Sequence, residues 1–170
     1  FPGGGGSTLD KVSEAEDAIM NGVDELDYVA DYRAFQRGDL EKVSEDIVAG
    51  TEVGLNNGKM VKWIIETGAL SKEEIEGITS LISDRVMNNF PGKAQNVFVK
   101  TSTGFYKGTG ATVDDVSLMK SKSGDLPVKA SGGVYNRKDL DNMVKAGASR
   151  IGTSRAYDIY KGKEGDSSGY

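Results

Sequence analysis

The sequence has no cysteine and no histidine, and only three prolines and one tryptophan among its 170 residues. Without cysteine, neither a disulfide framework nor a thiolate zinc site can form. Without histidine, the Ser-His-Asp and Cys-His forms of nucleophilic catalysis and the common imidazole metal sites are excluded. Acid–base chemistry is therefore left to lysine, aspartate, glutamate, tyrosine or bound water, and we expect neither a metal nor another cofactor.

Long apolar runs and basic runs are also missing. No segment approaches the length needed to cross a membrane and no signal peptide is visible, so we expect no membrane partner and take the cytoplasm as the default location. A net charge of −5 without any lysine- and arginine-rich run argues against nucleic-acid binding. With 37% hydrophobic and 28% charged residues, the chain has the composition of a globular protein, long enough for one domain with a real core.

The sequence that is present alternates apolar runs with segments of helical spacing. Ser71 and Glu74 form a predicted capping box, and Thr112 with Asp115 forms another. A polar stretch at 88–92 predicts a surface loop. The predicted strands lie at 24–30, 60–65, 97–100, 126–131 and 150–154. The predicted helices lie at 7–21 and about 39–49, after Ser71, after Thr112, and before Gly147.

Repeated strand–helix units with short connections predict parallel strands covered by helices, in the α/β class. Polar and glycine residues cluster after the strands, which fits both a (β/α)₈ barrel and a doubly wound open sheet. Phe1 and Pro2 resemble the end of a sixth strand, and the glycines at 3–6 predict a flexible loop. Five or six strands cannot close a barrel, so as a barrel the chain is an incomplete one that lacks its first two units and most of the third strand.

Two lysines, Lys100 and Lys129, each end an apolar strand and precede small residues. An ammonium strongly prefers water, so a lysine in this position usually marks chemistry or an anion site. Two nearby cations lower the pKa of one of them, and a neutral amine can attack a carbonyl to form a Schiff base. The alternatives are that Lys100 extends its amine into solvent, and that Lys129 only binds an anion or pairs with a carboxylate.

Asp27 lies at or near the end of the first predicted strand, on the same face as Glu25 by strand alternation. An inward carboxylate beside two lysines could keep one of them charged and pass protons through water, although a structural ion pair fits the pattern equally well. Glu66, which follows the second strand, is expected to hold residues of the site in place rather than to contact the substrate.

Three glycine-containing loops have the composition of phosphate cradles, because backbone N–H groups beside a helix N-terminus bind phosphate well. Two of them follow the last two strands, where (β/α)₈ barrels commonly hold phosphate. The loops are TSTGFYKGTG, ASGGV and RIGTSR.

The motifs DELDYV, KWIIETG, VFVKTSTG, VKASGGV and RIGTS, in this order, resemble the 2-deoxyribose-5-phosphate aldolase family, from Phe1 to about Ala156. The resemblance implies a (β/α)₈ TIM barrel and a metal-independent class I aldolase of deoxyribonucleotide catabolism. Such an enzyme, a lyase, cleaves 2-deoxy-D-ribose 5-phosphate to D-glyceraldehyde 3-phosphate and acetaldehyde.

The resemblance also implies roles for particular residues. Lys100 matches the Schiff-base lysine, Lys129 the second lysine, Asp27 the aspartate of the proton relay, and Tyr170 the C-terminal tyrosine that assists proton transfer. Arg155 stands where many members carry a serine, and an arginine can also pair with phosphate. The positions that match the phosphate loops are Gly104, Gly132, Gly133, Gly152 and Ser154.

We therefore expect a partial TIM-barrel aldolase domain at 1–160 and a flexible tail at 161–170. The expected partners are a sugar phosphate and an aldehyde, and a homodimer is left open. One alternative is an inactive, truncated barrel or phosphate-binding remnant that needs missing N-terminal strands. The other is a different phosphosugar barrel enzyme, which would exchange protons without forming an imine.

Overall fold

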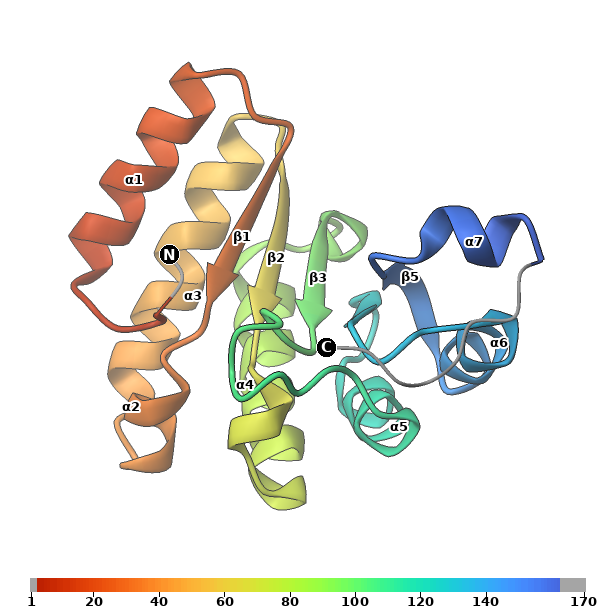
Figure 1. Ribbon diagram of the computed structural model, residues 1–170. Coiled ribbons are helices and arrows are strands. Elements are labelled where there is room, and N and C mark those ends of the chain that lie inside the picture. The colour runs from red at the N-terminus through yellow and green to blue at the C-terminus, as the bar shows by residue number, and fades with distance from the viewer. Residues whose placement is uncertain (1–2, 163–170) are drawn as a thin grey trace.

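The computed structural model describes residues 3–162 as one curved sheet of five strands wrapped by helices (Figure 1). The strands are hydrogen-bonded in chain order, and every neighbouring pair is parallel. The strands are β1 (Glu25–Val29), β2 (Met60–Ile64), β3 (Val97–Lys100), β4 (Val128–Ser131) and β5 (Ala148–Gly152). The predicted α/β class is confirmed, and the strand stub expected at residues 1–2 lies outside the described residues.

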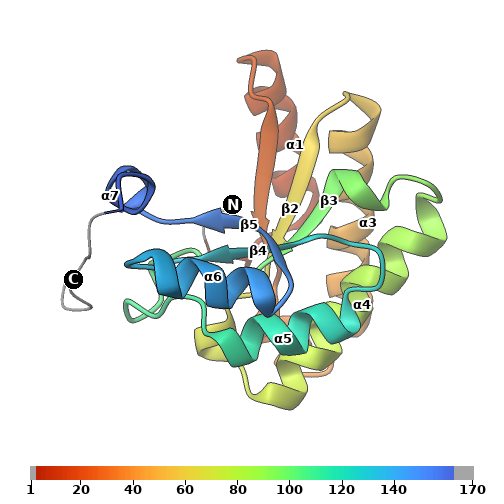
Figure 2. The ribbon, with the colours of Figure 1, turned by 90° about the vertical axis from the view of Figure 1, so that its right-hand side faces the viewer.

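The helices follow one side of this curved sheet (Figure 2). α3 packs on β1 and β2, α4 on β3, α5 on β4, and α6 on β5. The α-helices are α1 (Thr8–Met20), α2 (Tyr32–Gln36), α3 (Leu40–Asn56), α4 (Lys72–Asn89), α5 (Val113–Lys122), α6 (Arg137–Lys145) and α7 (Ala156–Tyr160). Two short 3₁₀ helices, η1 (Thr67–Ala69) and η2 (Ala94–Asn96), lie in the connections.

Side-chain caps begin the helices where the sequence predicts. The Ser71 hydroxyl accepts a hydrogen bond from the Glu74 N–H, and the Glu74 carboxylate accepts one from the Ser71 N–H. Thr112 begins α5 by accepting from the N–H of Asp115, but among the contacts of the described residues there is no return bond from the Asp115 carboxylate, so only half of the predicted capping box forms. Each bond satisfies a backbone donor that the first helical turn cannot pair internally. These helix starts are therefore fixed locally.

Helix ends and short helices differ from the predictions. The helix expected at about 39–49 continues to Asn56, and α4 continues to Asn89 through part of the stretch expected to be a loop. The helices α2 and α7 were not predicted. Each has five residues, which is too short for the 3.6-residue period to stand out.

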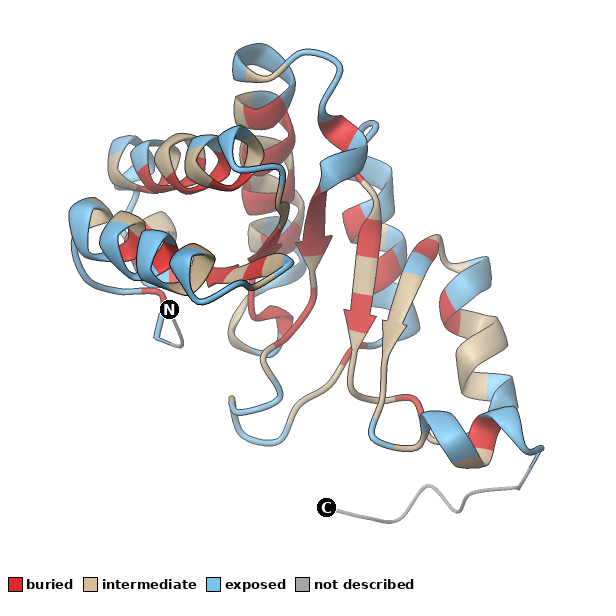
Figure 3. Ribbon diagram, turned by 90° about the horizontal axis from the view of Figure 1, so that it is seen from above, coloured by how far each residue is buried: buried red, intermediate tan, exposed pale blue. Residues whose placement is uncertain are grey.

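The helix-covered face of the sheet is apolar and buried (Figure 3). At its centre, the rings of Tyr28 and Trp63 stack with centroids 4.8 Å apart, and the Trp63 indole N–H donates to Thr51 Oγ1 at 3.0 Å. α3 approaches the sheet closely here, since a Cβ on Gly50 would stand 3.0 Å from the Trp63 ring and one on Gly54 only 2.3 Å from the Val61 side chain. This packing forms the main core.

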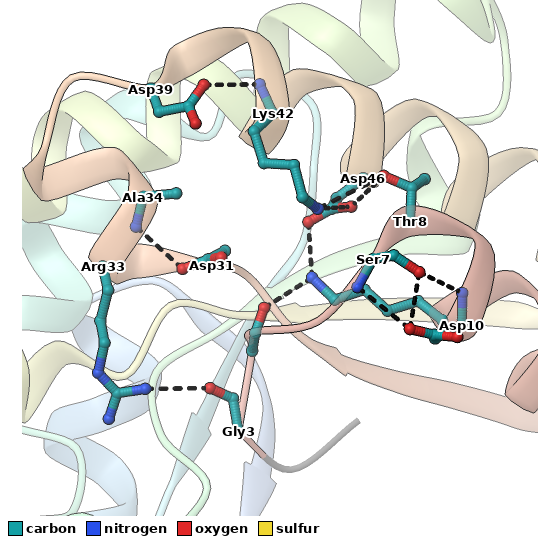
Figure 4. A network of polar contacts seen from close by, with 12 residues as sticks. Gly3, Ser7, Thr8, Asp10, Asp31, Arg33, Ala34, Asp39, Lys42 and Asp46 are labelled. Carbon is teal, nitrogen blue, oxygen red and sulfur yellow. Dashed lines mark hydrogen bonds and ion pairs between the residues drawn. The ribbon is translucent and has the colours of Figure 1, made fainter.

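The glycine loop at residues 3–6 is held by a buried ion cluster, which we call the anchor cluster: Thr8, Lys11, Lys42 and Asp46 (Figure 4). Asp46 Oδ2 lies 2.6 Å from Lys11 Nζ, and its Oδ1 accepts from Lys42 and Thr8. The Lys11 amine also donates to the Gly4 carbonyl at 2.6 Å. The segment predicted to be a flexible loop is therefore tied to α1 and α3.

Candidate active site

The face of the sheet turned away from the helices, here called the inner face, carries charged side chains from all five strands. Paired residues of a parallel sheet project to the same side. The register pairs Asp27 with Lys62, Lys100 with Lys129, and Lys129 with Arg150. Strand alternation therefore places an apolar set against the helices and a charged set on the inner face.

Lys100 and Asp27 meet on this face. Lys100 Nζ donates to Asp27 Oδ2 at 2.6 Å, and the other carboxylate oxygen, Oδ1, accepts from Lys62 Nζ at 2.5 Å. The side chains of Lys62 and Lys100 are 3% and 12% exposed, whereas that of Asp27 is 35% exposed. One partly accessible carboxylate therefore holds two sheltered ammonium groups.

The ionisation of Asp27 follows from these contacts. Burial by itself would raise the pKa of this carboxyl, but the hydrogen bonds from Lys100 and Lys62 outweigh it and hold the pKa below its ordinary value. Asp27 is therefore an anion at neutral pH, able to orient an amine on either side.

Lys129 lies beside Lys100 on the next strand but has a different environment. Among residues 3–162, no carboxylate lies within ion-pair distance of its amine. Burial lowers the pKa of Lys129, and the positive charge of Lys100 lowers it further. The sequence pattern predicted a proton loss at Lys100; the structure supports a lowered pKa at its neighbour, and the loss at Lys100 stays a prediction.

Glu25 and Arg150 extend the charged set toward the start of the strands. Arg150 Nη1 donates to Glu25 Oε1 at 2.8 Å, and Glu25 Oε2 lies 2.6 Å from Lys62 Nζ. The hydrogen bonds from Arg150 and then from Lys62 lower the pKa of Glu25 to about 2. The inner face thus carries a row of charged side chains that alternate in sign except at the neighbouring lysines of β3 and β4. We call it the inner-face cluster: Glu25, Asp27, Lys62, Lys100, Lys129 and Arg150.

A pocket of about 190 Å³ opens from Lys100 at the carboxyl ends of β3, β4 and β5. It unites most of the predicted phosphate positions, which lie far apart in the sequence. Lining it are Lys100, Thr103, Gly104, Ser131, Gly132, Gly133, Val134, Tyr135, Gly152, Thr153 and Ser154. A larger surface depression of about 660 Å³ lies between α3 and α4 and shares none of these residues. The smaller pocket is the better candidate because it contains the lysine.

Glycine is required where the loops of this pocket cross. Gly133 has a φ of +71°, and a Cβ there would stand 2.3 Å from the Ala111 carbonyl oxygen. A Cβ on Gly110 would stand 2.4 Å from the Gly133 nitrogen. The backbone after β3 therefore packs directly on the backbone after β4. At Gly152 a Cβ would meet the Ser131 hydroxyl at 2.9 Å and Lys129 Cε at 3.5 Å.

Arg155, predicted to bind phosphate, is not among the residues that line this pocket. Its guanidinium carbon lies 5.9 Å from the centroid of the Tyr135 ring, and Tyr135 does line the pocket. Arg155 therefore contacts a pocket-lining residue, Tyr135, rather than the pocket itself. A direct contact between Arg155 and phosphate stays a prediction. Tyr170 lies outside the described residues.

Glu66 does not line the pocket but holds a residue that does. The carboxylate is buried and accepts from both the backbone N–H (3.1 Å) and the hydroxyl (2.5 Å) of Thr103. The Glu66 backbone has a φ of +59°, a left-handed conformation unusual for a residue with a side chain. Since Thr103 lines the pocket, Glu66 fixes the loop that follows Lys100.

Two members of the inner-face cluster, Lys62 and Arg150, were not predicted from the sequence. Lys62 was hidden in an otherwise apolar strand, although a lysine two residues from both Met60 and Ile64 faces the same side as they do. Like Lys100, Lys62 is a lysine in an apolar strand, and on that ground it could have been identified as a site residue. Arg150 carried a weaker signal, because its partner Glu25 is 125 residues away.

Neither a metal site nor a membrane-spanning helix is found in the described part of the chain. No group of three or more acidic side chains in residues 3–162 is placed to hold a metal ion. No helix there combines the length and apolarity that a membrane span needs.

Comparison with known proteins agrees with the geometry. A deoxyribose-phosphate aldolase from Staphylococcus haemolyticus is 47% identical over 169 residues, which cover 98% of this chain and 71% of the relative. Another, from Staphylococcus aureus strain MSSA476, is 46% identical over 168 residues, 98% of this chain and 71% of that relative. A scan against protein-family models gave no match.

Solved structures give the same result. The aldolase QR15 superposes with a TM-score of 0.80 at 35% identity, over 95% of this chain and 68% of that one. A tetrameric deoxyribose phosphate aldolase from Aeropyrum pernix superposes with a TM-score of 0.76 at 29% identity, over 95% and 64%. The five-stranded sheet is thus part of a (β/α)₈ TIM-barrel architecture. With its identity to the curated relatives and this shared fold, the chain belongs to the deoxyribose-phosphate aldolase family.

Proposed function

We propose that this protein is a lyase, a class I aldolase that cleaves 2-deoxy-D-ribose 5-phosphate to D-glyceraldehyde 3-phosphate and acetaldehyde through a Schiff base. The observation that carries the proposal is the position of Lys100. Its sheltered amine, held by Asp27 and next to Lys129, opens into a pocket lined with glycine loops. An amine that forms imines must be sheltered, close to a proton acceptor and next to a substrate site.

The first half of the reaction forms the imine. The Lys100 ammonium gives up a proton, for which the neutral form of Lys129 is the acceptor favoured by its lowered pKa. The free amine then attacks the C1 aldehyde of the open-chain sugar, and loss of water from the resulting carbinolamine gives a protonated imine. Asp27 stabilises that cation because its carboxylate already holds the Lys100 nitrogen.

The second half breaks the carbon chain. Removal of the proton from the C3 hydroxyl forms the new aldehyde and breaks the C2–C3 bond, and its electron pair moves into the imine to give an enamine. D-glyceraldehyde 3-phosphate leaves. Protonation of the enamine carbon and addition of water then release acetaldehyde and free Lys100. Asp27, Lys129 and water are the groups assigned to these proton transfers, and Tyr170 is a further candidate.

The phosphate is assigned to the glycine loops at the other end of the pocket. Backbone N–H groups there can surround an anion without the steric bulk of side chains. The assigned positions are Gly104, Gly132, Gly133, Gly152 and Ser154, with Arg155 held at the rim by Tyr135. Phosphate binding would orient the sugar rather than take part in the bond changes.

Trapping with borohydride tests the proposal. The protein is incubated with acetaldehyde and sodium borohydride, digested, and its peptides are analysed by mass spectrometry. We expect an ethyl adduct on Lys100, because hydride reduces the imine of acetaldehyde to a stable secondary amine. The exposed Lys93 serves as an internal control for non-specific alkylation. An adduct on other lysines without one on Lys100 would overturn the assignment.

A phosphate-binding remnant without turnover is the alternative from the sequence. It would use the glycine loops but would give no role to the Asp27–Lys100 pair or to Lys129, which has no carboxylate partner within residues 3–162. The family comparison does not favour it. An isomerase-like phosphosugar enzyme would form no trapped imine.

Location and assembly are part of the proposal as well. We assign the protein to the cytoplasm, because a phosphorylated sugar is charged and does not cross a bilayer unaided. A homodimer is the proposed assembly, and light scattering of the purified chain would test it.

A further inference from the structure

The ion pair between Arg150 and Glu25 joins the first and last strands of the sheet, and the mechanism above leaves it without a role. Arg150 is on β5 and Glu25 is on β1, and the sheet order places three strands between them. The pair forms because the sheet curves, so that side chains from its two edges meet across the inner face. The Arg150 guanidinium also contacts Met60 Sδ at 3.5 Å and lies 5.8 Å from the Phe98 ring centroid.

This pair is connected to the reacting amine by hydrogen bonds. Glu25 shares Lys62 with Asp27, and Asp27 in turn holds Lys100. Lys62 is almost fully buried and has no polar partner among the described residues other than these two carboxylates. The position of the Asp27 carboxylate therefore depends on where Glu25 holds Lys62.

We propose that Arg150 and Glu25 are positioning residues of the aldolase site: they clamp β5 to β1 and, through Lys62, hold Asp27 against Lys100 and set the charge around the two lysines. The inference rests on the proposed function. Neither residue lines the pocket that opens from Lys100, so both act through other side chains.

The charges around Asp27 indicate how each residue should act. From β2, β3, β4 and β5, respectively, Lys62, Lys100, Lys129 and Arg150 face it, and Glu25 is the second carboxylate. The cluster has four basic groups for two acids, so removing Arg150 makes it less positive and removing Glu25 makes it more positive. A less positive cluster retains protons on its lysines to higher pH, and a more positive one releases them at lower pH.

The test measures the rate of imine trapping from pH 5 to pH 10 in wild type, Arg150→Gln, Glu25→Gln and Arg150→Lys. Imine formation needs a free amine, so its acidic limb reports the apparent pKa of the coupled lysines. We expect the limb to move upward in Arg150→Gln and downward in Glu25→Gln, by about half a unit to one unit each, the effect of one charge in a partly solvated cluster. Arg150→Lys keeps the positive charge, so its acidic limb should lie at the same pH as that of wild type.

Two exposed variants, Arg37→Gln directly after α2 and Glu52→Gln on α3, are matched controls for the lost charges, and thermal melts establish that each variant is folded. Opposite shifts in folded variants support the inference. If Arg150→Gln and Glu25→Gln both trap the imine more slowly without a shift of the acidic limb, the pair is only structural and the inference is wrong. The same holds if the limb moves in the same direction in both variants. If wild type traps no imine at Lys100 at any pH, the proposed function fails; if it does and the limbs do not move, only this inference fails.

Discussion

The protein contains two clusters of buried charge, and their differences separate structure from chemistry. In the anchor cluster, one carboxylate, Asp46, is surrounded by two lysines and a hydroxyl and is 1% exposed. In the inner-face cluster, Asp27 remains 35% exposed, and neighbouring Lys129 has no carboxylate partner among the described residues. A saturated cluster has nothing left to offer a substrate, whereas the inner-face cluster has an accessible carboxylate and an amine whose pKa is lowered by burial and by Lys100.

The same contrast appears in what surrounds each cluster. The anchor cluster binds a backbone carbonyl, that of Gly4, and so ties a loop to two helices. The inner-face cluster borders a pocket. Burial of charge costs free energy in both places, and only complete pairing offsets it. We therefore expect substitutions in the anchor cluster to affect stability and substitutions in the inner-face cluster to affect the reaction.

The largest expected effect is that of Lys100→Ala. Without its amine no imine forms, and turnover should fall by at least about 10⁴-fold, as is usual when a covalent nucleophile is removed. Affinity for inorganic phosphate should remain near that of wild type because the glycine loops are unchanged. Steady-state assays and calorimetry would measure these two quantities. The matched control, the exposed Lys93→Ala, should change neither. Residual turnover near wild type in Lys100→Ala would contradict the role of the inner-face cluster.

Asp46→Asn should have the largest effect on stability. It leaves Lys11, whose side chain is 6% exposed, without a counter-charge, and breaking a buried ion pair in this way costs about 3 to 5 kcal/mol. Urea unfolding would measure the loss. The exposed Asp17→Asn on α1 provides the control. The rate of imine trapping per folded molecule should not change, and a large change in that rate would erase the distinction between the clusters.

The two clusters also differ in how well the sequence predicts them. Lys100, Lys129 and Asp27 were found because each ends or nearly ends an apolar strand, and parallel strands bring such ends together. Lys62 was not, although its position in an apolar strand and its partner on the neighbouring strand give a comparable signal. Arg150 was not predicted because its pairing with Glu25 follows from sheet curvature, which no local pattern contains. The anchor cluster was missed for a related reason: Lys11 and Asp46 lie on different helices, and each resembles an ordinary solvated residue in its own helix.

The same difference between local signals and tertiary contacts applies to the fold. The five strands follow from apolar runs, and the capped helix starts follow from hydrogen bonds over three residues. Both signals are local, so the sequence predicted these elements. The short helices α2 and α7, the end of α3, and the stacking of Arg155 on Tyr135 depend on tertiary packing and were not predictable.

Acid should weaken the inner-face cluster over a defined range of pH. The pKa of Glu25 is lowered to about 2 in the folded protein from 4.5, so its contribution to stability is complete above about pH 4.5 and is lost as the pH falls through 2. We expect Glu25→Gln to be less stable than wild type near pH 6 and the two to converge toward pH 2. Urea unfolding at steps between pH 6 and pH 2 would measure this, and the exposed Glu52→Gln should show no such convergence. A constant difference down to pH 2 would mean that Arg150 and Lys62 do not stabilise the Glu25 carboxylate.

The smallest effect should come from Thr8→Val in the anchor cluster. The Thr8 hydroxyl donates one hydrogen bond to Asp46 at 2.7 Å, while two lysines continue to hold that carboxylate. Removal of a single hydrogen bond of this kind costs about 1 kcal/mol, which urea unfolding can resolve. Thr8→Ser keeps the hydroxyl and should retain most of the stability. A loss as large as that of Asp46→Asn would mean that the two lysines alone do not satisfy Asp46, and that the anchor cluster is less saturated than its geometry indicates.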